Sequence, residues 1–297
     1  RHLREGDIMG THLDTDVSRR SFLKTSGATA AVAAGALLWG CAPNTSKERT
    51  VSESGIPETW DEEADVVIVG SGVAGATTAR EMARWSLSAT VLEAGNDVAC
   101  GSTRANSGIV HAGYDPLPGT LKARFNVAGS KLFPQWADDL GFSYVRNGSL
   151  VLAFSDEERA SVRRLVARAV ENGVPGVRVL TREETLAMEP NLSDAVCGAL
   201  YAPSAAIVEP WDLALALAEA AVENGVELHL ETAVTGAEKI SGGWRLHTAK
   251  GDFEARAVVN AAGVEADLVA AMAGEPGFTT IPSRGEYYLL TKARAMW

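Results

Sequence analysis

The sequence predicts an α/β fold, in which a doubly wound parallel sheet is combined with an interleaved antiparallel sheet. Apolar strand candidates alternate with a helix candidate from residue 64 to residue 93, which is typical of a parallel sheet. A glycine-rich turn, GSGVAG at residues 70–75, joins the first strand to that helix. Short strand candidates cluster after residue 226, which favours antiparallel pairing.

Each further element follows from hydrophobic periodicity and from residues that stop a helix or a strand. The segment 156–173 has apolar residues at helical spacing and ends at Gly173, and another helix begins at Pro210. We expect helices at 74–86, 120–138, 156–173, 210–224 and 264–273, and strands at 64–69, 89–93, 143–146, 148–154, 196–202, 226–231, 233–239, 243–248, 252–261 and 286–291. A loop rich in Gly, Ser and Asn is expected at 101–113.

Composition sets limits on the class of protein. The chain has 297 residues, 46% of them hydrophobic and 22% charged, which suits a globular chain with one large domain or two smaller ones. Its net charge of −11 argues against nucleic-acid binding, which needs clustered Lys and Arg. The cysteines Cys41, Cys100 and Cys197 form no CxxC pair, so neither a metal site nor a disulfide framework is predicted.

The N-terminal segment 1–41 has the pattern of a twin-arginine export signal. Arg19-Arg20 is followed by Phe22, Leu23 and Lys24 and then by an Ala- and Gly-rich run to residue 40. That run is shorter than the roughly 20 apolar residues of a membrane span, so a signal-peptide core fits better. The alternative is an ordinary basic N-terminus. Residues 42–63 are polar and predict a linker.

Cys41 ends the sequence LLWGC, which is similar to a bacterial lipoprotein cleavage box. Trp39 is bulkier than the residue usually found at its position in such a box. Two interpretations therefore stay open: a lipid anchor on Cys41, or a buried cysteine in a signal that is cut elsewhere or retained. With either interpretation we expect an exported protein, located in the periplasm or at the cell surface.

The strongest chemical signal is the GxGxxG pattern of Gly70, Gly72 and Gly75, with Glu93 at the end of the next strand. The first glycine permits the tight turn, the second lets backbone approach a pyrophosphate, and the third lets helix pack on strand. The helix N-terminus, at Val73 and Ala74, offers free N–H groups to phosphates. Glu93 can accept hydrogen bonds from ribose hydroxyls. The alternative is a βαβ unit without a ligand.

The residues after Glu93 favour FAD over NAD as the bound dinucleotide. A nicotinamide-binding domain would continue its alternation of strand and helix, whereas this chain reads GNDVACGSTRANSGIVHAGYD at 95–115. The small residues in this loop let backbone approach a flat ring closely. A later apolar strand ends in Ala261-Ala262-Gly263, a second point of close approach. An NAD-dependent enzyme remains the competing hypothesis.

The segments GSTRANSGIVHAGYDPLPGTLKARFN, VVNAAGVEAD and RGEYYLL together resemble the glycine- and D-amino-acid-oxidase-like FAD-dependent oxidoreductases. Within that family the chain is similar to anaerobic glycerol-3-phosphate dehydrogenase large subunits and L-2-hydroxyglutarate dehydrogenases. The resemblance implies that FAD is bound by Gly70, Gly72, Val73, Ala74, Gly75, Glu93, Ser102, Thr103, Asn106, Ser107, Gly108, Val234, Ala262 and Gly263. Val234 would face the adenine and Gly263 the pyrophosphate.

The resemblance also implies a division into domains. Residues 64–142 and 210–275 would form the FAD-binding domain, and residues 143–209 and 276–297 the substrate domain. Family members continue beyond the RGEYYLL strand, so we expect a chain that is truncated at its C-terminus. The second functional hypothesis is accordingly a non-catalytic flavin- or nucleotide-binding lipoprotein.

The activity that the resemblance implies is oxidation of a CH–OH group, or less readily a CH–NH group, by hydride transfer to FAD. The substrate would be a small anion such as glycerol 3-phosphate or a 2-hydroxy acid. His111 would act as the base, and Arg284, Glu286 and Tyr287 would bind the substrate. The competing interpretations are a loop histidine satisfied by backbone and an ordinary strand-edge arginine. Electrons would pass to a membrane quinone or a redox partner protein.

Overall fold

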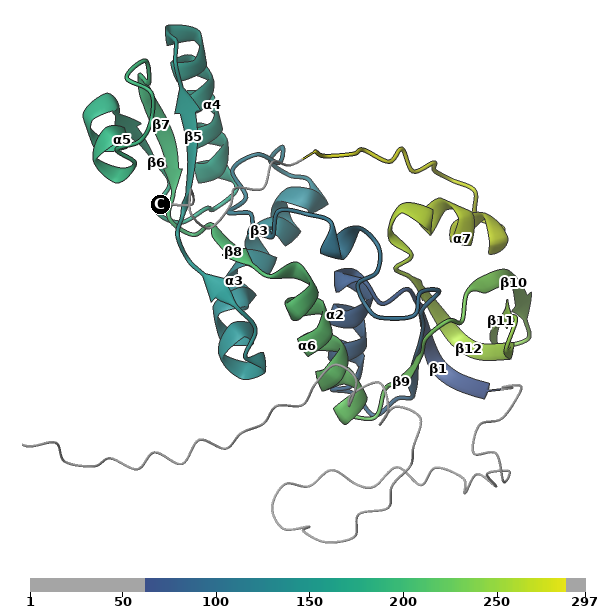
Figure 1. Cartoon of the computed structure of the whole chain (residues 1–297). Helices are drawn as coiled ribbons and strands as arrows, with labels where there is room; N and C mark the ends of the chain where they lie inside the picture. Colours follow the sequence, from purple (N-terminus) through teal and green to yellow (C-terminus); the bar gives the residue numbers. More distant parts are fainter. Residues whose placement is uncertain (1–61, 287–297) are drawn as a thin grey trace, which may run out of the picture. The chain divides into compact units, whose positions relative to one another are not determined.

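The computed structural model describes residues 62–286, and its largest sheet has six strands (Figure 1). The sheet has the order β10-β11-β12-β1-β2-β9. The strands are β1 (Glu62–Val69), β2 (Ala89–Leu92), β9 (Glu227–His229), β10 (Val234–Ile240), β11 (Gly243–Thr248) and β12 (Gly251–Asn260). The strands β12, β1, β2 and β9 are parallel neighbours, and β10 and β11 extend the sheet by antiparallel pairing.

The parallel strands end in register, which defines the edge where a ligand can bind. Val69, the last residue of β1, lies opposite Leu92 of β2 on one side and Asn260 of β12 on the other. Leu92 in turn pairs with His229 of β9. Ligands of open α/β sheets bind outside the carboxyl ends of the strands, so this edge is the expected site.

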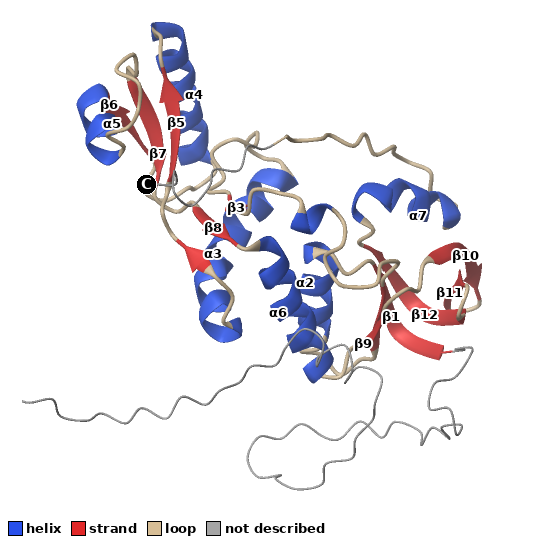
Figure 2. Ribbon diagram, viewed as in Figure 1, coloured by secondary structure: helices blue, strands red, loops and turns tan. Residues whose placement is uncertain are grey.

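Two helices, α2 (Val73–Met82) and α6 (Pro210–Glu223), lie side by side against the sheet (Figure 2). Ala79 of α2 and Ala221 of α6 share a buried cluster with Ile68 of β1 and Val91 of β2. Ile68 has no exposed surface, because it faces helices on one side of an internal strand. Burial of these apolar residues supplies the main stabilisation of this part of the fold.

Two further sheets have three antiparallel strands each. One has the order β3-β8-β4, and the other has the order β5-β7-β6. Their strands are β3 (Ile109–Val110), β4 (Tyr144–Val145), β5 (Ser149–Ala153), β6 (Arg178–Thr181), β7 (Gly198–Ala202) and β8 (Ala206–Val208). Helix α4 (Asp156–Glu171) packs on the second sheet through Val162 and Ala169. The remaining helices are α3 (Leu121–Leu140), α5 (Arg182–Met188), α7 (Ala266–Met272) and two short 3₁₀ turns, η1 (Ser102–Arg104) and η2 (Gly263–Glu265).

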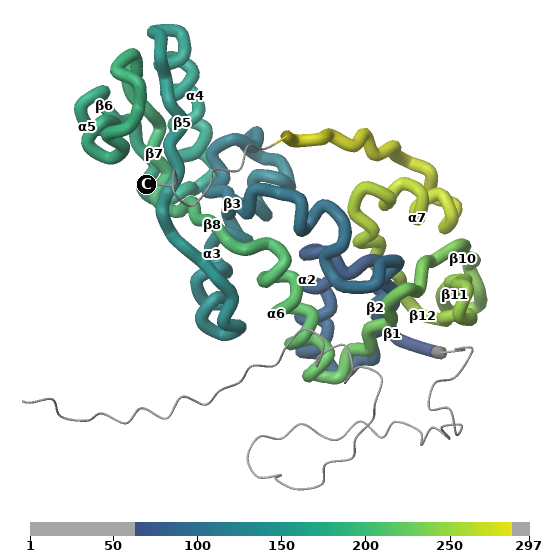
Figure 3. The backbone as a smooth tube through the Cα atoms, in the orientation of Figure 1, coloured from purple at the N-terminus to yellow at the C-terminus, as the bar shows by residue number. Residues whose placement is uncertain are grey.

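Side-chain caps explain where three helices begin. The hydroxyl of Thr120 accepts a hydrogen bond from the third residue of α3, and Ser155 does the same for α4. Helix α5 begins with a capping box, in which Thr181 and Glu184 exchange hydrogen bonds with each other's backbone N–H. After α7, residues 275–286 contain neither helix nor strand (Figure 3).

The predicted fold class is confirmed, and most predicted helices and strands are present. The prediction missed β3, β6, β8 and α5, which are all short. Of the late strands, β10, β11 and β12 pair antiparallel in order, as predicted, but they extend the parallel sheet instead of forming a separate one. The antiparallel prediction was wrong for β9, because it pairs parallel with β2, and β12 also pairs parallel with β1. The signal, residues 42–61 of the predicted linker, Tyr287 and most of the predicted strand 286–291 lie outside the described residues. The last two residues predicted as linker, 62 and 63, belong to β1. Among the residues 62–286, no helix is long and apolar enough to cross a membrane.

Candidate cofactor site

The turn after β1 brings three strand ends together. Gly70 has φ +99°, a conformation that L side chains rarely adopt. Its N–H donates to the Leu92 carbonyl at 2.8 Å, and a Cβ there would lie 2.6 Å from the Ala261 carbonyl oxygen. A Cβ on Gly75 would lie 1.8 Å from the Gly70 oxygen. Both glycines are therefore required for the turn to pack against the start of α2 and the end of β12.

Glu93 closes the turn from the side of β2. One of its carboxylate oxygens, Oε2, accepts hydrogen bonds from the backbone N–H and the hydroxyl of Ser71, each at 2.7 Å, and Oε1 accepts from the Gly95 N–H at 2.7 Å. The Glu93 carbonyl accepts from the Thr232 N–H at 2.8 Å. This last bond brings the start of β10, where Val234 lies, beside Glu93.

The N-terminus of α2 has the properties of an anion site. Gly72 is its N-cap residue and supplies no side-chain hydrogen bond, and the first turn holds no acidic residue. The Val73 N–H, predicted to be free, is instead bonded to Thr103 Oγ1 at 3.0 Å. Both Val73 and Ala74 are exposed. Backbone N–H groups and the helix dipole together favour a negatively charged group at this position.

The loop at 102–108 is organised by one amide. The Asn106 side chain donates to the carbonyls of Ser102 and Thr103, and its oxygen accepts from the Gly108 N–H at 2.7 Å. Gly108 has φ +66°, and a Cβ there would lie 2.1 Å from the Val208 carbonyl oxygen. Asn106 thus shapes the loop, while Ser102 and Ser107 remain exposed beside it.

The end of β12 forms the remaining wall of this site. The Ala262 N–H donates to Asn260 Oδ1 at 3.3 Å, and Gly263, with φ +62°, begins the turn η2. Gly263 is exposed, and a Cβ there would meet nothing within 4 Å. The strand therefore ends in a small, accessible stretch of backbone next to the Gly70 turn.

Among the predicted catalytic residues that the structure describes, only Arg284 and Glu286 contact each other. His111 is exposed and follows β3, between the buried residues Val110 and Ala112. Arg284 and Glu286 form an ion pair of 3.4 Å with side chains 85% and 79% exposed. Within residues 62–286, neither of the two makes a hydrogen bond or ion pair with His111. Tyr287 lies outside the described residues.

One residue of the site was not predicted. Ser71 is 1% exposed and holds the Glu93 carboxylate. It lies inside the glycine motif, so its position between Gly70 and Gly72 was the available signal. Ala261, which was predicted to lie at a point of close approach, supplies the carbonyl against which Gly70 packs.

The residues present fit FAD. Three glycines leave the β1 turn and the start of α2 without side chains, which suits a pyrophosphate, and Glu93 lies at the end of the neighbouring strand as ribose recognition requires. Gly70, Gly72, Val73, Ala74, Gly75, Glu93, Ala262 and Gly263 line this edge and would hold the dinucleotide. The part of the chain that the structure describes contains no group of three or more His, Cys, Asp or Glu arranged for a metal ion.

Two family profiles match the chain. The family described as FAD dependent oxidoreductase matches residues 65–296. The twin-arginine translocation pathway signal sequence matches residues 16–36, so the predicted signal is confirmed at the level of sequence.

Curated relatives include a glycerol 3-phosphate dehydrogenase of Caloramator mitchellensis, which is 44% identical over 77% of this chain and 48% of the relative. An L-2-hydroxyglutarate dehydrogenase of Escherichia coli is 34% identical over 76% of this chain and 54% of the relative. This chain therefore spans about half the length of these two proteins.

Solved structures show the same similarity. The FAD-bound L-α-glycerophosphate oxidase from Mycoplasma pneumoniae superimposes with a TM-score of 0.68 at 32% identity, over 72% of this chain and 57% of the other. A glycine oxidase from Geobacillus kaustophilus superimposes with a TM-score of 0.67 at 33% identity, over 72% of this chain and 59% of the other.

Proposed function

The chain belongs to the FAD-dependent oxidoreductase family, and from that premise we propose that the protein oxidises a CH–OH group of a small anionic substrate. Glycerol 3-phosphate and 2-hydroxy acids are the candidate substrates, because relatives named for both are similar to this chain. The observation that carries the proposal is the cradle of Gly70, Gly75 and Glu93 at the ends of three parallel strands.

In this cradle the start of α2 would bind the pyrophosphate and Glu93 the adenosine ribose. Glu93 is held by Ser71 and Gly95, so it is oriented before the ligand arrives. FAD, when bound, supplies the ring system that accepts a hydride. The loop at 102–108, with the small residues Ser102 and Ser107 at its surface, would lie against that ring system.

We assign removal of the substrate hydroxyl proton to the imidazole of His111. The side chain is exposed and follows the short strand β3, while its neighbours Val110 and Ala112 are buried and anchor the backbone on either side. An exposed imidazole with an anchored backbone can meet substrate without rearrangement of the core. Imidazole is the side chain most often used for general acid–base catalysis by enzymes.

We assign the substrate's anionic group to Arg284, together with Glu286 and Tyr287. A guanidinium binds phosphate or carboxylate through two parallel hydrogen bonds. Its present partner is Glu286 at 3.4 Å in a highly exposed pair, which contributes little stability. Exchange of this partner for a substrate anion therefore has a low energetic cost.

The twin-arginine signal directs export of folded proteins, and a flavoprotein folds around its cofactor before export. We propose that the electrons pass to a membrane quinone or to a redox partner protein, and that Cys41 carries a lipid anchor. Cys41→Ser in the full chain would abolish incorporation of a labelled fatty acid. Retained incorporation would contradict the anchor and leave the export signal unaffected.

The domain division also stays a proposal, with residues 64–142 and 210–275 forming the FAD-binding domain and residues 143–209 and 276–297 the substrate domain. The six-stranded sheet takes its strands from the first pair of segments, and the sheet β5-β7-β6 lies wholly within 143–209, which supports this division. Sheet β3-β8-β4 joins strands from both sets.

The test is the visible absorption spectrum of the purified full chain, followed by anaerobic addition of glycerol 3-phosphate or L-2-hydroxyglutarate. We expect a flavin band that bleaches with one of these substrates. A flavin band that neither substrate bleaches would support the alternative of a non-catalytic flavin-binding protein. A colourless protein that takes up no added FAD would show that the cofactor assignment is wrong for this chain.

His111→Asn should keep the flavin band and slow the bleaching by about 10²–10⁴-fold, the usual contribution of a general base. The control is His247→Asn, because His247 bonds Asp252 within the sheet at 2.9 Å and belongs to none of the proposed catalytic groups. Equal bleaching rates in the two variants would exclude His111 as the base.

A further inference from the structure

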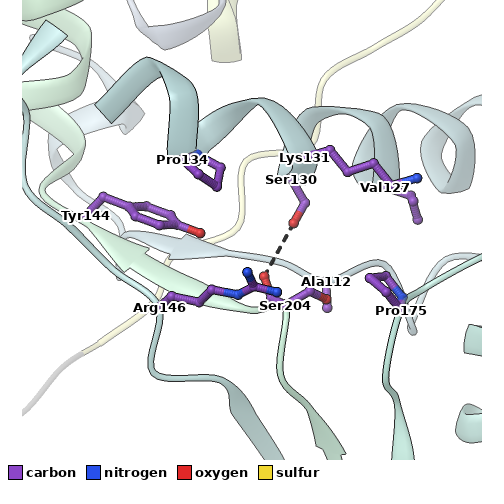
Figure 4. Close-up of a pocket in the computed structure, with 9 residues that line it drawn as sticks. All are labelled: Ala112, Val127, Ser130, Lys131, Pro134, Tyr144, Arg146, Pro175 and Ser204. Atoms are coloured by element: carbon purple, nitrogen blue, oxygen red, sulfur yellow. Dashed lines mark hydrogen bonds between the residues drawn. The ribbon is translucent and has the colours of Figure 1, made fainter. Parts of the chain in front are cut away.

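A cavity of about 180 Å³ lies between helix α3 and the chain segments that surround β4 (Figure 4). Ser130 and Lys131 line it from the helix, Tyr144 and Arg146 from β4 and the turn after it, and Ser204 from the turn before β8. None of these residues belongs to the cofactor cradle. The cavity is smaller than the roughly 300–1,000 Å³ of pockets for drug-sized ligands, so it suits a small molecule.

The charged groups that line this cavity are all basic. Lys131 and Arg146 are present and no carboxylate lines the cavity, although the chain as a whole carries a net charge of −11. Neither forms an ion pair within the described residues, whereas Arg178 and Arg245, among others, pair with glutamates. Two cations without counter-charges make the cavity electropositive within an acidic protein.

Arg146 is held in place while most of its donors stay available. Its Nε donates to the Pro203 carbonyl at 3.1 Å, and no other hydrogen bond to the described residues engages its terminal Nη groups. Tyr144 stacks on Phe133 with ring centroids 6.3 Å apart, and its hydroxyl points toward Arg146 and Ser204 (Figure 4). Arg146 is an exposed residue anchored at Nε, and its free terminal N–H groups match the fork geometry that binds oxyanions.

The hydroxyl groups around this cavity make few hydrogen bonds within the protein. Ser130 Oγ reaches the Ser204 carbonyl only at 3.5 Å, which is at the limit for a hydrogen bond. Ser204 Oγ also has no hydrogen-bond partner among the described residues, but it has almost no accessible surface and so does not face an occupant. The weakly engaged Ser130 hydroxyl is the group that favours a polar occupant.

We propose that this cavity is a second binding site, for a small oxyanion: a phosphate or carboxylate group on a body of a few carbon atoms. Arg146 would bind the anion through its terminal N–H groups, and Lys131 would neutralise its charge. The Tyr144 and Ser130 hydroxyls would complete its hydrogen bonds. Ala112, which also lines the cavity, is the direct neighbour of His111, so the site adjoins the backbone that carries the proposed base.

The test is calorimetric titration of the full chain, saturated with FAD, with inorganic phosphate at constant ionic strength. We expect saturable binding of one phosphate and at least tenfold weaker binding in Arg146→Gln and in Lys131→Gln. Arg163→Gln is the matched control, because Arg163 is exposed on α4 and away from the cavity lining. The affinity of that variant for phosphate should be within about twofold of the wild-type affinity, since salt screens a surface charge that lies away from the cavity.

Absence of saturable heat, or equal affinities of all three variants and the wild type, would overturn the proposal. Thermal melting of each variant with and without phosphate separates loss of the site from loss of the fold, because a folded variant without the site melts at the same temperature in both conditions. The flavin band should be unchanged by Arg146→Gln. The flavin band therefore measures FAD binding independently of phosphate binding.

Discussion

The Glu93 carboxylate accepts two hydrogen bonds from Ser71, one from its N–H and one from its hydroxyl, both at 2.7 Å. This pair ties the glycine turn after β1 to the end of β2. Ser71 is almost fully buried, so both of its donors depend on this one carboxylate oxygen. Glu93 therefore has a structural role in addition to the ribose contact that we propose for it.

Glu93→Gln should destabilise the fold and weaken FAD binding together. Only one terminal atom of the amide can accept hydrogen bonds, so either the Gly95 N–H or both donors of Ser71 lose their acceptor. Loss of a hydrogen bond to a charged group costs about 1.5–3 kcal/mol. Thermal melting of the protein without FAD measures the first effect and flavin titration the second, for which we expect at least a tenfold loss. Glu171→Gln, on the exposed end of α4, is the control and should change neither.

Gly75→Ala should destabilise the protein and abolish FAD retention. A Cβ would lie 1.8 Å from the Gly70 oxygen and 2.9 Å from its carbon, so α2 must shift away from the turn. Overpacking of this kind costs about 1–3 kcal/mol. Denaturant unfolding and the flavin absorption after gel filtration measure the two effects.

Gly129→Ala is the matched control for Gly75→Ala, since it makes the same change in the interior of α3 where a Cβ would meet nothing within 4 Å. It should stabilise the protein by roughly 0.5–1 kcal/mol, because alanine favours the helix. An equal loss of stability in both variants would show that the tight packing at Gly75 is not the cause.

Glu219→Gln should stabilise the protein at neutral pH. Burial, and then the nearby charges of Glu223 and Asp212, raise the pKa of Glu219 above its usual value of 4.5. The folded state therefore favours the proton, and the stability from it is complete below about pH 4.5 and is lost as the pH rises through the raised pKa. We expect a Tm higher by a few degrees at pH 7–8 and no gain at pH 4. A gain that is equal at both pH values would contradict the ionic explanation.

Asp65→Asn should have the opposite pH dependence. The Ser88 backbone N–H, its hydroxyl and Arg256 at 3.2 Å hold the pKa of Asp65 below its usual value. A carboxyl whose pKa is lowered by folding stabilises the protein at pH values above its pKa in the unfolded chain, near 3.9. That stability is lost as the pH falls through its pKa in the folded protein. The variant should lose about 1 kcal/mol at pH 7, and the loss should shrink below pH 4. Urea unfolding at both pH values measures it, and a loss that grows toward low pH would refute the assignment.

The cofactor cradle was predictable because its requirements are local. Glycine spacing, an apolar strand before it and Glu93 after the next strand lie within thirty residues of chain, and each imposes a backbone or hydrogen-bond constraint that sequence reveals. The apolar strand that ends in Ala261-Ala262-Gly263 predicted a second point of close approach, and the resemblance to the family assigned Gly263 to the pyrophosphate. The details of that approach, with Gly70 against the Ala261 carbonyl, required the pairing of β1 with β12.

The short elements were missed because their stability comes from partners and not from their own residues. Strand β8 has three residues and forms a sheet only by lying between β3 and β4. Pairing with its neighbours therefore determines this strand more than the intrinsic β propensity of its residues does, as is usual for strands. The catalytic residues differ again: His111 and Arg284 were selected by resemblance, and their joint role remains a prediction.

Periodicity and motif spacing established the α/β class, the dinucleotide motif and the export signal, since these depend on residues close together in the chain. Tertiary structure decided the order of the six strands, the Ser71–Glu93 pair and the cavity between Ser130 and Arg146. Each of these joins residues on different elements, and the free energy of such contacts is set by burial and geometry that no local pattern encodes.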